Sequence, residues 1–147
     1  MPASFSTGPV NAQSVAAMCQ AAPGRFARGI GTSSDVIVEQ WNGIPFVKPV
    51  QRVRDTIRFL RAALAGEKVT EEYDTFSVKG FRLGVELAEP PPILVAALRP
   101  GMLKIAGTEG DGAIINWLSA DDVRTVVPHV GDDKEIVARI FVLATEA

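Results

Sequence analysis

The chain has 147 residues, of which 47% are hydrophobic and 22% are charged, and this composition fits one soluble globular domain better than two. Fifteen Lys and Arg residues against 17 Asp and Glu residues give a formal net charge of -2. That balance excludes attraction to nucleic acid or to an anionic membrane by net charge alone, so a small, specific ligand is the better expectation.

Cysteine usage and hydropathy point to a cytoplasmic protein. Cys19 is the only cysteine, so an internal disulfide is impossible and nothing indicates an oxidising compartment. Residues Met1–Gln13 lack the basic and apolar regions of a secretory signal, and no later apolar run approaches the ~20 residues of a membrane helix. We therefore expect a cytoplasmic location and no membrane partner.

The first predicted elements are a short helix and a short strand. Residues Ser14–Ala22 contain no helix breaker and stop at Pro23-Gly24, which predicts a helix closed by a turn. A brief strand is expected over Phe26–Gly31. Its tip, Gly29–Ser34, is small and polar, which is typical of a loop that approaches a ligand closely.

The clearest helix is predicted over Lys48–Ala65, with Pro49 in its first turn and Gly66 just beyond its end. Apolar residues recur every three or four positions, which predicts one core face: Val50, Val53, Ile57, Leu60 and Leu64. The opposite face is expected to be solvated: Arg52, Arg54, Asp55, Arg58 and Arg61.

Residues Glu67–Val85 alternate partly between apolar and polar side chains and are broken at Gly80, which predicts a hairpin. This insertion, at about residues 67–90, interrupts an otherwise regular α/β order. It ends at the three prolines that precede Ile93.

The rest of the chain follows a βαβαβ pattern, which implies a parallel sheet that is either open or closed into a barrel. Ser119 and Asp122 have the spacing of a capping box for the second helix. The predicted order is strand Ile93–Leu98, helix Pro100–Ala106, strand Gly112–Leu118, helix Ala120–Val127 and strand Ile136–Leu143.

Ligands of parallel α/β folds bind at the carboxyl ends of strands, so the loops after Gly31, Leu98 and Leu118 are candidate sites. Residues Ala97–Met102 pass from a buried strand into a helix whose first turn contains Pro100 and Gly101. Free N–H groups there, with the Arg99 guanidinium, suit a phosphate group. An ordinary strand-to-helix turn is the alternative interpretation of the same pattern.

Other chemistry-bearing residues are better explained by structural roles. His129, the only histidine, comes near a helix end and is expected at the surface. With one His, one Cys and no clustered carboxylates, neither a metal site nor a Ser-His-Asp triad is expected. Trp117 is expected to pack in the core, whereas Trp41 is the better candidate for a loop over a ligand or for a subunit contact.

Several phrases of this sequence, taken in order, resemble the luciferase-like family, especially the branch that uses the deazaflavin coenzyme F420. The resemblance covers nearly the whole chain, roughly Val10–Val142. The phrases are Pro23–Phe26 leading to Gly29–Ser34, Trp41–Gly43, Arg52–Asp55, Pro91–Leu98, Ala106-Gly107 and Asp111-Gly112.

The resemblance implies an α/β fold that is part of a (β/α)₈ TIM barrel. The chain would correspond to the barrel from about strand three or four to strand seven. At most five parallel strands are then expected, including a remnant before Ser14. In the family, the segment after strand five holds the cofactor phosphate and the tip of strand four lies near the flavin-like ring. The implied cofactor-binding residues are Ala97, Leu98, Arg99, Pro100, Gly101 and Met102 for the phosphate, and Gly31, Thr32, Ser33 and Ser34 for the ring.

No catalytic acid or base is assigned by the resemblance. Some deazaflavin-dependent sugar-phosphate dehydrogenases of the family have a glutamate where this sequence places Ser34. Their acid/base histidine comes from amino-terminal strands that have no counterpart here, and His129 does not match it.

The expected function is hydride transfer between F420, with FMN as the alternative cofactor, and a small organic substrate. The rival expectation is a truncated, non-catalytic member that oligomerises or binds a partner. Homo-oligomers are expected in either case, because a partial barrel would leave the inward faces of Ile93–Leu98 and Gly112–Leu118 under-covered.

Overall fold

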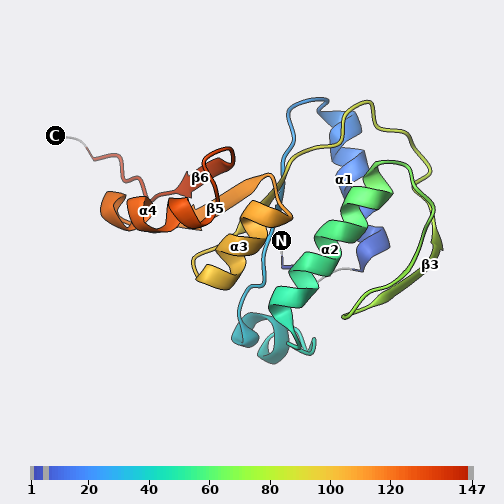
Figure 1. The fold of residues 1–147 in the computed structure, drawn as a ribbon, viewed down its shortest axis with the longest axis horizontal. Coiled ribbons are helices and arrows are strands. Elements are labelled where there is room, and N and C mark those ends of the chain that lie inside the picture. The colour runs from blue at the N-terminus through green and yellow to red at the C-terminus, as the bar shows by residue number, and fades with distance from the viewer. Residues whose placement is uncertain (1, 5–6, 146–147) are drawn as a thin grey trace. The chain divides into compact units, whose positions relative to one another are not determined.

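The computed structural model describes residues 2–4 and 7–145, and its contacts divide the chain into two compact units, Met1–Ile93 and Leu94–Ala147. Figure 1 shows the elements of both units. The expectation of a single domain over residues 1–147 stays a prediction. The first unit contains α1 (Gly8–Ala21), β1 (Arg28–Ile30), the π-helix η1 (Val36–Gln40), α2 (Pro49–Leu64), β2 (Val69–Glu72) and β3 (Ser77–Phe81).

Helix α2 confirms the predicted amphipathic helix and forms the centre of the first unit. Val53, Ile57 and Leu60 are completely buried, as their spacing along one helix face predicts. Two assignments of the sequence analysis were wrong. Val50 is 40% exposed, and Asp55, expected on the solvated face, is 2% exposed because the hairpin that follows α2 supplies its hydrogen-bond partners.

Helix α1 begins at Gly8, earlier than the predicted start at Ser14. A Cβ atom at Gly8 would lie 2.8 Å from Cδ1 of Phe59 in α2. Glycine at this position therefore allows the first turn of α1 to approach the Phe59 ring closely.

Strand β1 is held at both ends by backbone hydrogen bonds within the first unit. The Arg28 N–H donates to the Pro92 carbonyl at 2.8 Å, and the Ala3 N–H donates to the Gly31 carbonyl at 2.8 Å. Pro2 and Gly31 form an isolated parallel bridge, so a remnant of extended chain does precede α1. The Arg28 guanidinium bonds to the buried Asn11 side chain, and burial lowers the pKa of Arg28.

The predicted hairpin is confirmed. Strands β2 and β3 pair antiparallel, with Val69 opposite Phe81 and Glu72 opposite Ser77. Phe59 of α2 packs edge-on against Phe76, with ring centroids 6.2 Å apart, and lies 5.6 Å from the Phe81 ring. These aromatic contacts attach the hairpin to α2.

The second unit contains β4 (Ile93–Ala96, apart from its first residue), α3 (Pro100–Thr108), β5 (Gly112–Asn116), α4 (Ala120–Val126), the 3₁₀ helix η2 (Val127–His129) and β6 (Glu135–Arg139). Strands β4, β5 and β6 are adjacent and parallel, which confirms the predicted α/β class with a parallel sheet and flanking helices. The predicted capping box is also present, since the Ser119 hydroxyl accepts from the Asp122 N–H and the Asp122 carboxylate accepts from the Ser119 N–H.

Two glycines of the second unit are required by close backbone packing. A Cβ atom at Gly107 would lie 2.1 Å from the Val130 carbonyl oxygen, and one at Gly112 would lie 2.1 Å from the Glu135 carbonyl oxygen. Gly107 near the end of α3 and Gly112 at the start of β5 therefore serve the packing of the fold.

The last two predicted strands are shorter than expected. Strand β5 ends at Asn116. Asn116 pairs with Arg139, which is the last paired residue of β6. Ile140, Phe141, Val142 and Leu143 are therefore outside the strand and 66% to 85% exposed. Ile93, Val95, Ala113 and Ile115 share one face of β4 and β5 and are at most 1% exposed, whereas Ala96 and Ile114 on the opposite face are half-buried. The expected under-coverage of the inward strand faces stays a prediction.

Candidate functional site at the carboxyl ends of the parallel strands

The junction between β4 and α3 is an extended residue followed by a helix start without a side-chain cap. Arg99 is extended, with φ −115° and ψ 153°, and Pro100 begins the helix. No side chain caps this helix end. The first-turn N–H groups of a helix have no partner within the helix, and the helix dipole adds partial positive charge there.

The backbone hydrogen bonds divide the six predicted phosphate-binding residues into two groups. Three of them offer no free N–H group. The Ala97 N–H donates to the Ile114 carbonyl at 3.0 Å, the Met102 N–H donates to the Arg99 carbonyl at 3.0 Å, and Pro100 has no N–H. Within residues 2–4 and 7–145, no hydrogen bond engages the N–H groups of Leu98, Arg99 or Gly101. Among the six residues, these three N–H groups are therefore the backbone donors without an acceptor in the described part of the chain.

The side chains around the turn leave room for a ligand. A Cβ atom at Gly101 would have no neighbour within 4 Å, so the fold itself does not require glycine at this position. The Arg99 side chain is exposed and has no acidic partner in the described part of the chain. The Met102 side chain, by contrast, is only 8% exposed and anchors the helix.

The second predicted segment, Gly31–Ser34, lies at the carboxyl end of β1 in the first unit. Ser33 has φ +64°, a left-handed conformation that is unusual for a residue with a side chain. The Thr32 hydroxyl donates to the Ser33 carbonyl at 3.0 Å, and the Ser34 hydroxyl accepts from the Ile37 N–H at 3.3 Å. These hydroxyl groups therefore shape the turn into η1, a π-helix that the sequence analysis did not predict.

Trp41 follows η1 and is 74% exposed, which agrees with the expected loop position. The loop is closed by two hydrogen bonds: the Asn42 amide donates to the Ile37 carbonyl at 2.6 Å, and the Gly43 N–H donates to the Glu39 carbonyl at 2.9 Å. Gly43 has φ +64°, a conformation that favours glycine.

Trp117 was predicted to pack in the core, and this prediction was wrong. The side chain is 59% exposed and follows directly after β5. Its backbone has φ +55°, which turns the chain out of the strand. Local hydrophobicity predicts burial here, but the chain turns at the end of β5 and leaves most of the Trp117 side chain exposed.

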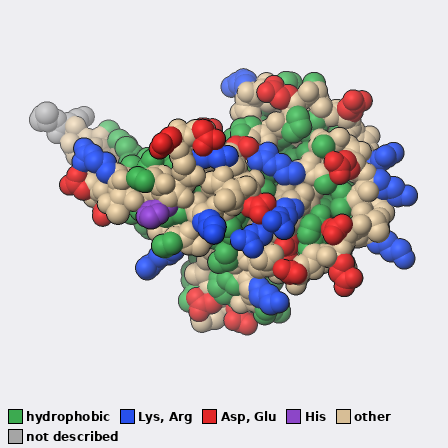
Figure 2. Space-filling model, in the orientation of Figure 1, with side chains coloured by type: hydrophobic (Ala, Val, Ile, Leu, Met, Phe, Trp, Pro, Cys, Tyr) green, Lys and Arg blue, Asp and Glu red, His purple; other side chains and the backbone are tan. Residues whose placement is uncertain are grey.

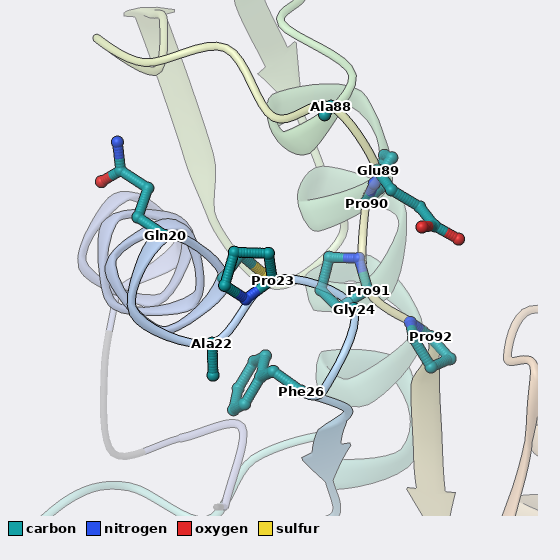
Figure 3. A pocket seen from close by; sticks show the side chains of 11 residues that line it. Gln20, Ala22, Pro23, Gly24, Phe26, Ala88, Glu89, Pro90, Pro91 and Pro92 are labelled. Carbon is teal, nitrogen blue, oxygen red and sulfur yellow. The ribbon is translucent and has the colours of Figure 1, made fainter.

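An apolar cavity of about 330 Å³ lies elsewhere in the first unit, beside the amino ends of β1 and β4. Figure 3 shows Pro23, Pro91 and Phe26 around it. Cys19 also lines the cavity, and burial raises the pKa of its thiol, which makes the thiol less nucleophilic. None of the predicted cofactor-binding residues lines this cavity.

His129 is exposed at the end of η2, and Figure 2 shows the only histidine at the surface of the second unit. No group of three or more potential metal ligands occurs among the described residues. In the same part of the chain, no helix is long and apolar enough to cross a membrane.

Comparison with known proteins assigns the chain to a family. The sequence pattern described as "Luciferase-like monooxygenase" matches residues 4–144. The chain belongs to the luciferase-like family. The resemblance stated from the sequence phrases is therefore confirmed.

Curated relatives in the luciferase-like family include enzymes named for F420. The F420-dependent glucose-6-phosphate dehydrogenase of Kineococcus radiotolerans is 34% identical over 135 residues, which are 88% of this chain and 40% of that protein. The 5,10-methylenetetrahydromethanopterin reductase of Methanolobus tindarius is 28% identical over 121 residues, 82% of this chain and 36% of that protein. The chain thus spans about two fifths of the length of these relatives.

Solved structures of the luciferase-like family share the fold. The coenzyme F420 dependent tetrahydromethanopterin reductase from Methanopyrus kandleri superimposes with a TM-score of 0.81 at 20% identity, over 91% of this chain and 46% of that one. An F420-dependent secondary alcohol dehydrogenase, solved in complex with an F420-acetone adduct, gives a TM-score of 0.74 at 18% identity, over 91% of this chain and 45% of that one. The chain therefore has the fold of part of a TIM-barrel luciferase-like enzyme.

Proposed function

We propose that this chain binds coenzyme F420 and takes part in hydride transfer between F420 and a small organic substrate. The observation that carries the proposal is the β4–α3 turn, where no described group accepts from the N–H groups of Leu98, Arg99 or Gly101. Beside them the Arg99 side chain is exposed, and a Cβ atom at Gly101 would have no neighbour within 4 Å. Curated relatives named for F420 support the choice of cofactor.

In this proposal the phosphate of F420 is held by the β4–α3 turn of the second unit. The N–H groups of Leu98, Arg99 and Gly101 donate to phosphate oxygens, and the Arg99 side chain adds a charge-assisted hydrogen bond. Ala97, Pro100 and Met102, which were predicted as contacts, position the turn through strand pairing, the fixed proline φ and burial of the Met102 side chain.

Ser33, with Gly31, Thr32 and Ser34, is proposed to contact the deazaflavin ring, as the family resemblance implies. The support within the first unit is the left-handed backbone at Ser33 and the two hydrogen bonds of the neighbouring Thr32 and Ser34 hydroxyl groups, which together define the conformation of the strand tip. When bound, F420 supplies the hydride chemistry.

Separate titrations with F420 and FMN, followed by cofactor absorbance or fluorescence, test the proposal. We expect F420 to bind at or below about 50 µM. Replacement of Gly101 by Val should weaken binding by about tenfold or more, because a branched side chain fills the space that the phosphate would occupy. Arg99→Gln should weaken it by a similar factor through loss of the charge-assisted bond.

Two control variants separate this effect from damage to the fold. Gly84 is exposed and also has open space around its Cα, so Gly84→Val should bind F420 like the parent chain. His129→Ala should also leave binding unchanged. Tighter binding of FMN than of F420 would favour the alternative cofactor, whereas binding of neither would favour the rival hypothesis of a non-catalytic, partner-binding member of the family.

A further inference from the structure

The carboxyl ends of β5 and β6 carry an exposed aromatic stack with a cation beside it. The rings of Trp117 and Phe141 are 5.0 Å apart between centroids and 16° from parallel. The Arg139 guanidinium carbon lies 5.2 Å from the Trp117 ring centroid. Trp117 is 59% exposed and Phe141 is 78% exposed. We call these three residues the aromatic platform.

Core packing does not explain the aromatic platform. The Trp117 backbone lies in the left-handed region, at φ +55°, a conformation that is unfavourable for a residue with a side chain. The Trp117 N–H donates to the Arg139 carbonyl at 3.1 Å, so the β6 partner holds the backbone in this conformation. The result is a large apolar ring presented to solvent, which is the reverse of what a stabilising tryptophan does.

The charge of the platform limits the ligands that it can take. Arg139 is exposed, and in the part of the chain that the structure describes no carboxylate pairs with it. A guanidinium next to aromatic faces complements a flat, conjugated group that carries a carboxylate. Ring stacking recognises the plane, and the guanidinium fork recognises the two carboxylate oxygens.

The position of the platform fits a substrate site beside the proposed cofactor turn. Strands β4, β5 and β6 are parallel and adjacent, so their carboxyl ends share one edge of the sheet, where ligands of such folds bind. The turn at Leu98–Gly101 follows β4, and Trp117 follows β5. Neighbouring strands are about 4.8 Å apart, so the two features are next to each other within the second unit.

We propose that Trp117, Arg139 and Phe141 bind the organic substrate, and that this substrate is a planar, conjugated carboxylate. The role of this ligand as a substrate rests on the proposed F420-linked function, but its binding to the aromatic platform can be tested without cofactor. The platform residues determine specificity in this proposal and carry out no proton transfer.

Nitrogen-15 nuclear magnetic resonance of the full chain tests the site directly. Trp41 and Trp117 are the only two tryptophans, so Trp41→Phe leaves the Trp117 indole N–H as a single reporter. In this background, trans-cinnamate should shift the Trp117 indole resonance saturably at concentrations below about 10 mM. Cinnamyl alcohol, which lacks the charge, and 3-phenylpropanoate, which lacks the conjugated plane, should each bind about fivefold or more weakly.

Substitutions of the platform residues test which side chains contact cinnamate. Arg139→Gln and Phe141→Leu should each weaken cinnamate binding by about fivefold or more. Arg124→Gln is the matched control, because Arg124 is an exposed arginine of the same unit that pairs with Asp121 instead, and it should bind cinnamate like the parent. Unchanged backbone resonances away from the platform would show that each variant is folded.

The inference is overturned if cinnamate produces no saturable Trp117 shift, if Arg139→Gln binds it equally well, or if cinnamyl alcohol binds as tightly. The F420 titration is run on the same samples to separate the two proposals. F420 binding without cinnamate binding leaves the proposed function in place and removes the platform. Cinnamate binding without F420 binding keeps the platform and removes the proposed function.

Discussion

Asp55 is buried inside the first unit although it lies among arginines in the sequence. Its carboxylate accepts from the Gln51 amide at 2.8 Å, from the Thr75 N–H at 3.0 Å and from the Thr75 hydroxyl at 2.7 Å. The two contacts from Thr75 connect α2 to the turn of the β2–β3 hairpin. A single carboxylate thus fixes the position of one element on another.

Replacing Asp55 by Ala is expected to lower the free energy of unfolding by about 2–4 kcal/mol, because charge-assisted hydrogen bonds are lost and the Thr75 donors are left without a partner. Urea unfolding followed by circular dichroism measures the change. Asp132→Ala, at an exposed position, should change it by less than about 0.5 kcal/mol. Equal effects of the two substitutions would contradict a structural role for Asp55.

At the scale of elements, the hairpin is attached to α2 by an aromatic cluster with acidic residues around it. Tyr73 packs on Phe76, with ring centroids 4.8 Å apart, and its N–H donates to the Phe76 carbonyl at 2.8 Å. Burial raises the pKa of the Tyr73 phenol, and the negative charges of Glu71, Asp55 and Glu67 raise it further.

The only tyrosine of the chain should therefore ionise above the usual pKa of about 10. Since the folded state holds the phenolic proton more tightly than the unfolded state, this contribution to stability is complete below about pH 10 and is lost as the pH rises through the folded-state value. Ultraviolet absorbance of the phenolate during an alkaline titration measures the midpoint. Glu71→Gln should lower the midpoint, and Glu89→Gln should not. A midpoint in the native chain equal to that in urea would disprove the shift.

At the scale of the whole molecule, exposed apolar side chains are concentrated near the end of the described chain. Ile140, Val142 and Leu143 lie on either side of the platform residue Phe141 in the sequence, and each is at least 66% exposed. Covering apolar surface is worth about 25 cal/mol per Å², and runs of this kind mark association surfaces. The segment adds a second reason to expect self-association, beside the inward strand faces.

The isolated chain is accordingly expected to form oligomers whose fraction rises with concentration, as sedimentation velocity would measure. Val142→Ser combined with Leu143→Ser should shift the distribution toward monomer, because it removes apolar surface without touching a described hydrogen bond. Val10→Ser, at a 52% exposed position of α1, is the control and should leave the distribution unchanged. A monomer at every concentration would refute the prediction.

Several elements were determined by local sequence. Helix α2 follows from apolar spacing between Pro49 and Gly66, and the start of α4 follows from the Ser119 and Asp122 pair, because periodicity and capping depend on residues a few positions apart. The apolar run that begins at Ile93 predicted a buried parallel strand for the same reason. The strand-to-helix turn at Ala97–Met102 was also a candidate phosphate site from local sequence, and the family resemblance assigned it to the cofactor. Local sequence predicted that free N–H groups occur in this turn but not which residues carry them.

Burial and strand ends were decided by the tertiary structure. Asp55 is buried because Thr75, distant in sequence, supplies its donors, and Trp117 is exposed because its bond to Arg139 holds a left-handed backbone at the end of β5. Strand β6 ends where β5 stops pairing with it, which leaves Ile140–Leu143 in solvent despite their strand-like composition. In each case the deciding partner is remote along the chain, so no local pattern encodes it.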